Sequence, residues 1–297
     1  HALSRGDTVR AQQALADARE ALAQITGQVA ASLRGDGYAD PIHLIGAETH
    51  VPYQRPPLSK GLLLGKMDRA RLLFRQPAFY AAQSIDLMLG ATVTALDPAA
   101  RIVTLSTGRL VPYDQLVIAT GTRVRPLAIP GTELDGVVYL RTLDESEGLA
   151  RRVGAADRVV VIGGGFIGLE VAAAVRMLGK PATVLEAADR LMGRVVAPVI
   201  STFYADLHRR QGVELVLNAR IERLEGEAGR VRSVIMADGT RHLHAVEPRH
   251  VHVQEGDGGF MLVEELDGLA AVARLGHHLQ LGPEPGQLLL QVLAQQR

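Results

Sequence analysis

The stretch RVVVIGGGFIGLEVAAAVRMLGKPATVLE, residues 158–186, decides how this chain folds. It opens with the β-branched run Val159–Ile162, which has no polar residue to turn toward water and is typical of a parallel strand buried on both faces. A glycine-rich turn follows, and apolar residues then recur at helical spacing up to Gly179, where a helix would stop. A second apolar run ends in the acid Glu186. The stretch therefore predicts a strand–helix–strand unit of a parallel sheet.

The glycines of this stretch fit the pattern G-x-G-x-x-G. Gly163 permits a tight turn, Gly165 lets the backbone approach a pyrophosphate, and Gly168 lets the helix pack closely on the strand. The helix N-terminus favours phosphate, and an acid at about the distance of Glu186 accepts the ribose 2′-hydroxyl. The agreement of these parts predicts a dinucleotide site rather than a glycine turn that serves packing alone. The residues expected to bind the cofactor are Gly163, Gly165, Phe166, Ile167, Gly168 and Glu186.

The residues around Glu186 favour NADH over NADPH. The Glu186 carboxylate would repel a 2′-phosphate, and the next three residues, Ala187–Asp189, supply no cation. Arg190 is the one nearby residue that offers a positive charge.

Length and composition exclude several classes of protein. A chain of 297 residues is long enough for about two domains. The 32 basic and 32 acidic side chains balance, which argues against nucleic acid or an anionic membrane as partner. No apolar run reaches the roughly 18 residues of a membrane span, so the cytoplasm is the expected location. The absence of cysteine excludes disulfides, thiolate metal sites and a redox-active dithiol.

The C-terminal part of the chain carries two H-x-H pairs, His242 with His244 and His250 with His252. In a strand each pair would share a face and could chelate Zn²⁺ or Ni²⁺. No cysteine or ordered acid cluster accompanies them, so we expect no natural metal site. The closing apolar run, Leu288–Leu293, is expected to form a short exposed helix.

Several stretches together resemble a known family. They are PYQRPPLSK (52–60), YDQLVIATGTRVRPL (113–127), YLRTLDESEGL (139–149) and the glycine-rich stretch itself. They look like the FAD-dependent NADH:ferredoxin reductases, which include rubredoxin and putidaredoxin reductases and belong to the pyridine nucleotide-disulfide oxidoreductase superfamily. The resemblance implies hydride transfer from NADH to FAD, followed by single-electron transfer to an iron–sulfur partner of the ferredoxin or rubredoxin type. It implies no catalytic protein residue, because the chemistry belongs to the cofactors.

The resemblance also implies contacts to FAD. They are Glu48 at the adenosine ribose, Arg55 and Lys60 beside the flavin and its phosphates, Pro57 near the ring, and Ala119, Thr120, Gly121 and Arg125 close to the cofactor.

The chain departs from the family at both ends. The first strand and glycine motif, which would cradle the FAD pyrophosphate, are reduced to Thr26-Gly27, and residues 241–297 supply no convincing return to the flavin domain. We therefore predict an α/β, Rossmann-like flavoprotein reductase fold with two dinucleotide-binding domains. An incomplete FAD domain would span residues 1–125, with 1–27 a divergent helix, an intact NAD(P)-binding domain 126–245, and a divergent tail 246–297. FAD retention is expected to be weak or absent.

Two functions follow from these observations. The first is an FAD- and NADH-dependent ferredoxin-type reductase, and the alternative is a nicotinamide-binding domain of a truncated reductase without electron-transfer activity. A local excess of cations, Lys66, Arg69, Arg71 and Arg75, is either a solvated face or a docking patch for an acidic iron–sulfur protein.

Overall fold

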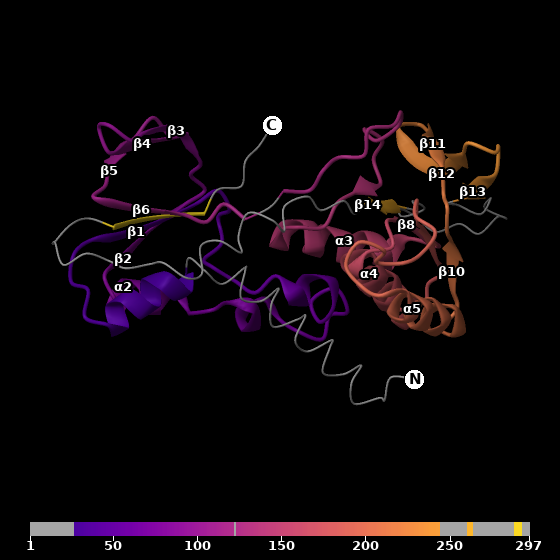
Figure 1. Ribbon diagram of the computed structural model, residues 1–297, viewed down its shortest axis with the longest axis horizontal. Coiled ribbons are helices and arrows are strands. Elements are labelled where there is room, and N and C mark those ends of the chain that lie inside the picture. The colour runs from indigo at the N-terminus through magenta and orange to yellow at the C-terminus, as the bar shows by residue number, and fades with distance from the viewer. Residues whose placement is uncertain (1–26, 122, 244–259, 264–287, 293–297) are drawn as a thin grey trace. The chain divides into compact units, whose positions relative to one another are not determined.

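The computed structural model describes residues 27–121, 123–243, 260–263 and 288–292. These residues divide into two compact units. Unit 1 holds the described residues up to Pro56, those from Arg69 to Arg123, and residues 288–292, whereas unit 2 holds Pro57–Asp68 and the remainder. Both units are α/β (Figure 1), so the predicted fold class is confirmed. None of the described helices is long and apolar enough to cross a membrane.

The main sheet of unit 1 is parallel, with the strand order β2-β1-β15-β6. Its strands are β1 (Ile42–Gly46), β2 (Ile85–Leu89), β6 (Gln115–Ile118) and β15 (Leu288–Val292). Residues 27–35 are helical, and α2 (Pro77–Ala82) lies on one face of the sheet (Figure 1). Both helical segments contribute to a core with the sheet, made by Ala30, Leu33, Ile42, Leu44, Tyr80 and Ile85.

A three-stranded antiparallel meander belongs to the same unit, with strands β3 (Val93–Asp97), β4 (Ile102–Leu105) and β5 (Leu110–Pro112). Its buried residues Val103, Leu105 and Val111 pack with Ile45 of β1 and Met88 of β2. Successive residues of a strand point to opposite faces, and Ile42 and Leu44 join the helical core while Ile45 joins the meander. Both faces of β1 are therefore covered, as a parallel sheet requires.

The position of β15 corrects one prediction. The run that begins at Leu288 was expected to be an exposed helix, but residues 288–292 form a strand that pairs on both sides, with β1 and with β6. Short apolar runs suit buried strands and helix segments equally, so periodicity alone does not separate them. Parallel pairing on both sides gives the strand ladder hydrogen bonds with two neighbours.

The main sheet of unit 2 has five parallel strands in the order β10-β9-β8-β14-β7. They are β7 (Val137–Val138), β8 (Val159–Ile162), β9 (Ala182–Leu185), β10 (Val213–Val216) and β14 (Phe260–Val263). All four residues of β8 and of β9 are buried, in agreement with the apolar character of their sequences. In this order β14 lies between β8 and β7 and pairs with both.

Three helices and a second sheet complete unit 2 (Figure 1). The helices are α3 (Leu143–Ala155), α4 (Phe166–Met177) and α5 (Pro198–Arg210), and the antiparallel strands are β11 (Ile221–Glu227), β12 (Arg230–Met236) and β13 (Arg241–Leu243). A capping box starts α3, because the Thr142 hydroxyl accepts from the Glu145 N–H while the Glu145 carboxylate accepts from the Thr142 N–H. A proline in the first turn starts α5, where a missing N–H costs nothing.

The segment that leads into α3 is fastened to the β11–β12 hairpin. The Leu224 N–H donates to the Pro130 carbonyl at 2.9 Å, and the Val231 N–H donates to the Asp135 carbonyl at 2.9 Å. Gly131 lies at this contact with φ +91°, and a Cβ there would stand 2.3 Å from the Leu224 carbonyl oxygen. Only glycine fits this close approach of two backbones.

We expect Gly131→Ala to destabilise unit 2 much more than Gly229→Ala. Gly229 also has a positive φ, +78°, but its added Cβ would meet nothing within 4 Å. The Gly229 variant should therefore lose only the cost of the left-handed backbone, about 1 kcal/mol, whereas the Gly131 variant must also displace the hairpin. Urea unfolding of both variants and the parent measures the difference. Equal losses in the two variants would contradict the proposed contact.

Candidate functional site

The glycine-rich turn lies between β8 and α4. Gly163 follows the last residue of β8 with φ +110°, and its N–H donates to the Leu185 carbonyl at 2.8 Å. Gly165 is the N-cap of α4 and, having no side chain, makes no side-chain cap hydrogen bond. The turn therefore delivers the chain from the carboxyl end of a buried strand directly to a helix N-terminus, whose dipole favours an anion.

Glu186 follows β9 and lies against this turn. Its Oε2 accepts from the Gly164 N–H at 2.6 Å and its Oε1 from the Ala188 N–H at 2.7 Å. The strand pairing places β8 and β9 side by side, so the acid and the turn occupy one sheet edge. This contact brings together the residues that the sequence analysis assigned to pyrophosphate and to ribose.

Gly164 also lies at the candidate site, although the sequence did not single it out. A Cβ at this position would stand 2.6 Å from Leu191 Cδ2 and 3.0 Å from Glu186 Oε2. The motif G-x-G-x-x-G leaves this position open, and the only sequence signal was the unbroken run of three glycines. Its lack of a side chain is what lets its N–H reach the carboxylate.

Arg190, the one cation that the sequence offered to a 2′-phosphate, is bonded elsewhere. Its Nη1 donates to the Val196 carbonyl at 2.8 Å and to Ser201 Oγ at 3.0 Å, and its Nη2 donates to the Gly193 carbonyl at 2.5 Å. These bonds hold the guanidinium in the loop before α5. The Glu186 carboxylate lies against the glycine turn, and the preference for NADH stays a prediction.

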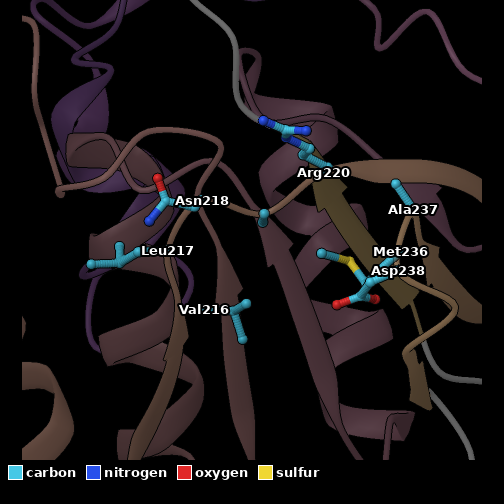
Figure 2. Close-up of a pocket in the computed structure, with 8 residues that line it drawn as sticks. Val216, Leu217, Asn218, Arg220, Met236, Ala237 and Asp238 are labelled. Carbon is cyan, nitrogen blue, oxygen red and sulfur yellow. The ribbon is translucent and has the colours of Figure 1, made fainter.

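A pocket of about 310 Å³ lies beyond the carboxyl end of β10 (Figure 2). Figure 2 shows Leu217 and Asn218 on one side of it and Met236 and Asp238 on the other. Its wall is bonded to the site, because the Asn218 N–H donates to the Ala188 carbonyl at 2.9 Å and the Ala219 N–H donates to the Glu186 carbonyl at 2.8 Å. Hydrogen bonds from Thr240 lower the pKa of Asp238. The bond from the backbone N–H contributes most, and the bond from the side chain comes second. Sequence patterns missed this pocket, where Asn218 follows β10 with a positive φ of 55°.

The segment Pro57–Asp68 is held on α4 and α3. Lys60 Nζ lies 3.1 Å from Glu170 Oε1, and Ser59 Oγ donates to Glu170 Oε2 at 2.5 Å. Ser146 Oγ donates to the Leu58 carbonyl at 2.6 Å. Lys60, expected beside a flavin, therefore belongs to the unit that carries the glycine turn, and its partner Glu170 went unnoticed in the sequence.

The remaining residues that the resemblance assigned to a flavin fall in both units. In unit 1, Glu48 accepts from Arg55 Nη2 at 2.5 Å and from Tyr53 Oη at 2.5 Å, so two predicted contacts pair with each other. Residues Ala119–Gly121 follow β6, and Gly121 has φ +66°. Pro57 and Arg125 belong to unit 2. Their assignment to a flavin stays a prediction.

The cations of the predicted docking patch also divide between the units. Arg69, Arg71 and Arg75 are exposed residues of unit 1, and Arg69 Nη2 donates to His50 Nδ1 at 2.6 Å. The Arg75 guanidinium lies over the Phe79 ring, 5.6 Å from its centroid. Lys66 belongs to unit 2. Among the described residues no group of three metal-ligating side chains could hold an ion, and His244, His250 and His252 lie outside them.

Comparison with known proteins defines the class. The family model of the pyridine nucleotide-disulphide oxidoreductases matches residues 27–254, and the chain belongs to this family. The family implies FAD and NAD(P)H as cofactors. The glycine turn and Glu186 described above lie within the matched range.

Individual relatives narrow the comparison. The chain is 42% identical over 210 residues to the probable ferredoxin reductase CtmF of Castellaniella defragrans, and 42% identical over 219 residues to the putidaredoxin reductase CamA of Pseudomonas putida. These alignments cover 71% and 72% of this chain but 51% and 52% of the relatives, so the chain spans about half their length. It is thus similar to ferredoxin-type reductases over about 70% of its length.

Solved structures agree. A ferredoxin reductase from Rhodopseudomonas palustris superposes with a TM-score of 0.73 at 39% identity, covering 81% of this chain and 56% of that one. The reductase of a covalent putidaredoxin reductase–putidaredoxin complex gives 0.73 at 38% identity, covering 82% and 56%. The predicted family resemblance is confirmed.

We expect Gly164→Ala to weaken NADH binding at least tenfold. The added methyl would push Leu191 and the Glu186 carboxylate out of place, and a tenfold loss corresponds to about 1.4 kcal/mol. Gly154→Ala is the matched control, since its Cβ would meet nothing within 4 Å and its φ is not positive. Titration of NADH fluorescence measures both variants. An unchanged affinity for NADH in Gly164→Ala would show that the glycine turn does not contribute to NADH binding.

Proposed function

We propose that this chain is the NADH-binding part of a ferredoxin-type reductase, an oxidoreductase whose coenzyme binds in unit 2. The observation that carries the proposal is the hydrogen bond from the Gly164 N–H to the Glu186 carboxylate. It joins the two halves of a dinucleotide site, the turn at a helix N-terminus and the acid after the neighbouring strand. The family match and the names of the relatives support the same class of reaction.

The residues of unit 2 have separate tasks in this proposal. The N-terminus of α4 attracts the pyrophosphate, and the missing side chain at Gly165 leaves room for it. The Glu186 carboxylate accepts hydrogen bonds from the ribose hydroxyls. The N–H groups of Gly164 and Ala188 already hold this carboxylate in position. When bound, NADH supplies a hydride from its nicotinamide, so the protein contributes binding and orientation.

A second candidate is the complete reaction, in which electrons pass from NADH through FAD to an iron–sulfur protein. It is favoured by unit 1, whose sheet is parallel and retains Glu48 and the turn Ala119–Gly121 at the carboxyl ends of β1 and β6. Purified protein is tested for NADH binding and for NADH-dependent reduction of a ferredoxin. Binding without reduction supports the first function, reduction supports the second, and failure to bind NADH contradicts both.

The coenzyme preference is testable at Glu186. Glu186→Ala should weaken NADH binding about tenfold, roughly 1.4 kcal/mol, because a charged hydrogen-bond acceptor is lost. The double variant Glu186→Ala/Ala187→Arg should in addition bind NADPH more tightly than the parent does, since a cation replaces a repulsive charge. Fluorescence titration with both coenzymes gives the ratio of dissociation constants.

Glu186→Gln separates the charge from the hydrogen bond. It keeps an oxygen acceptor for the Gly164 N–H and removes the negative charge, so it should relax the discrimination against NADPH with a smaller loss of NADH affinity. A parent protein that already prefers NADPH would overturn the assignment of Glu186.

The three exposed arginines of unit 1 are proposed to dock an acidic iron–sulfur partner. Reversing two of them, Arg69→Glu/Arg71→Glu, should slow association with a ferredoxin and flatten its dependence on ionic strength. The pair Arg101→Glu/Arg109→Glu, also exposed and in unit 1, is the charge-matched control. Stopped-flow binding across a salt series measures the rates. If the association rates of the two double variants depend equally on ionic strength, the arginines of unit 1 are a solvated face and do not dock the partner.

A further inference from the structure

The loop between β9 and α5 closes against the glycine turn. The Met192 N–H donates to the Gly164 carbonyl at 3.0 Å, and the Gly164 N–H donates to the Glu186 carboxylate. Leu191 lies beside the same glycine, since a Cβ there would stand 2.6 Å from Leu191 Cδ2. Leu191 and Met192 are both buried, and they pack with Leu169 of α4. The loop therefore fixes the position of Gly164, whose N–H holds the acid assigned to the ribose.

The backbone of this loop is strained at Met192. This residue has φ +50°, in the left-handed region that is unfavourable for a residue with a side chain. Such a conformation persists only where the surrounding contacts hold it. Without those contacts the loop would relax, and the Met192 N–H would leave the Gly164 carbonyl. The loop therefore needs an anchor close to Met192.

Arg190 and Ser201 supply this anchor. The Arg190 guanidinium donates to the Gly193 and Val196 carbonyls, at 2.5 and 2.8 Å. It also donates to Ser201 Oγ at 3.0 Å, and the buried Ser201 Oγ donates to the Leu191 carbonyl at 2.6 Å. A planar guanidinium has enough fixed donors to hold several acceptors at once. The bonds reach carbonyls on both sides of the strained residue, so they hold its backbone from both directions.

We propose that Arg190 and Ser201 are positioning residues of the NADH site. They hold the strained loop in place, and the loop in turn fixes Gly164, which orients the Glu186 carboxylate. The cation of Arg190 thus serves the shape of the site instead of binding a 2′-phosphate. This inference rests on the proposed function, because it assumes that NADH binds at the glycine turn.

Arg190→Met tests the proposal, because it keeps an unbranched apolar side chain and removes every N–H donor of the guanidinium. We expect about tenfold weaker NADH binding, the loss that accompanies one misplaced hydrogen bond to a charged group. Ser201→Ala should also weaken binding, since it removes the acceptor for Arg190 and the donor to Leu191. Titration of NADH fluorescence measures each dissociation constant in the full-length protein, and urea unfolding shows that each variant is folded.

Arg176→Met is the matched control. Arg176 is likewise partly buried, and its Nε donates to the Gln211 carbonyl at 3.1 Å and its Nη1 to the Lys180 carbonyl at 2.9 Å. These carbonyls precede β10 and β9, which are parallel, so they lie at the sheet edge opposite the glycine turn. The control should lose stability in urea and keep the parent's affinity for NADH. Equal weakening of NADH binding in Arg176→Met and Arg190→Met overturns the inference, because a general loss of stability would then explain both.

Two further measurements separate positioning from stability. In the coenzyme-free protein, Arg190→Met should speed hydrogen exchange of the Met192 N–H, and Arg176→Met should not. The double variant Arg190→Met/Ser201→Ala should lose less affinity for NADH than the product of the two single losses, because both residues act through one loop. Unchanged exchange at Met192, or losses that multiply in full, overturn the inference.

Failure of the positioning role is distinguishable from failure of the proposed function. A parent chain that binds no NADH contradicts the proposed function, and the positioning role is wrong with it. If the parent binds NADH and Arg190→Met binds it equally well, the NADH site stands and only the positioning role is wrong.

Discussion

The contact between the Gly164 N–H and the Glu186 carboxylate joins the parts on which the structure of unit 2 depends. It lies where β8 and β9 end side by side, and it forms only because position 164 has no side chain. The buried strands on either side fix the two backbones, so the acid and the turn cannot drift apart without loss of the ladder between them. A local constraint on one glycine thereby sets how the turn after β8 and the acid after β9 lie against each other.

The sequence predicted unit 2 well because its signals are local. Strand, turn, helix, strand and acid follow one another within residues 158–186, and each has a recognisable pattern. What the sequence could not provide were partners distant along the chain. Glu170 forms an ion pair with Lys60, which lies 110 positions earlier in the chain. The pocket beyond β10 forms where the hairpin brings Asn218 and Asp238 together.

Unit 1 shows the opposite case. Its sheet seemed to lack a central strand because the sequence before β1 contains no strand pattern, and the strand that fills the place lies more than 240 residues further along. A run of five mostly apolar residues does not indicate which strands it will pair with, and it is compatible with either a helix or a strand. Only the pairing with β1 and β6 decides its conformation, so the identity of β15 is a tertiary property.

The comparison of the two sheets separates what closes a fold from what makes a site. A parallel sheet requires of each inner strand that it completes the backbone hydrogen bonds of both neighbours, and β15 pairs in this way with β1 and β6. A dinucleotide site makes a further demand on the residues just after the strand, where a side chain would block the phosphate. In unit 2 the glycines Gly163–Gly165 follow β8, as the proposed NADH site needs. The pairing of strands in a parallel sheet is therefore not by itself a reason to assign a cofactor.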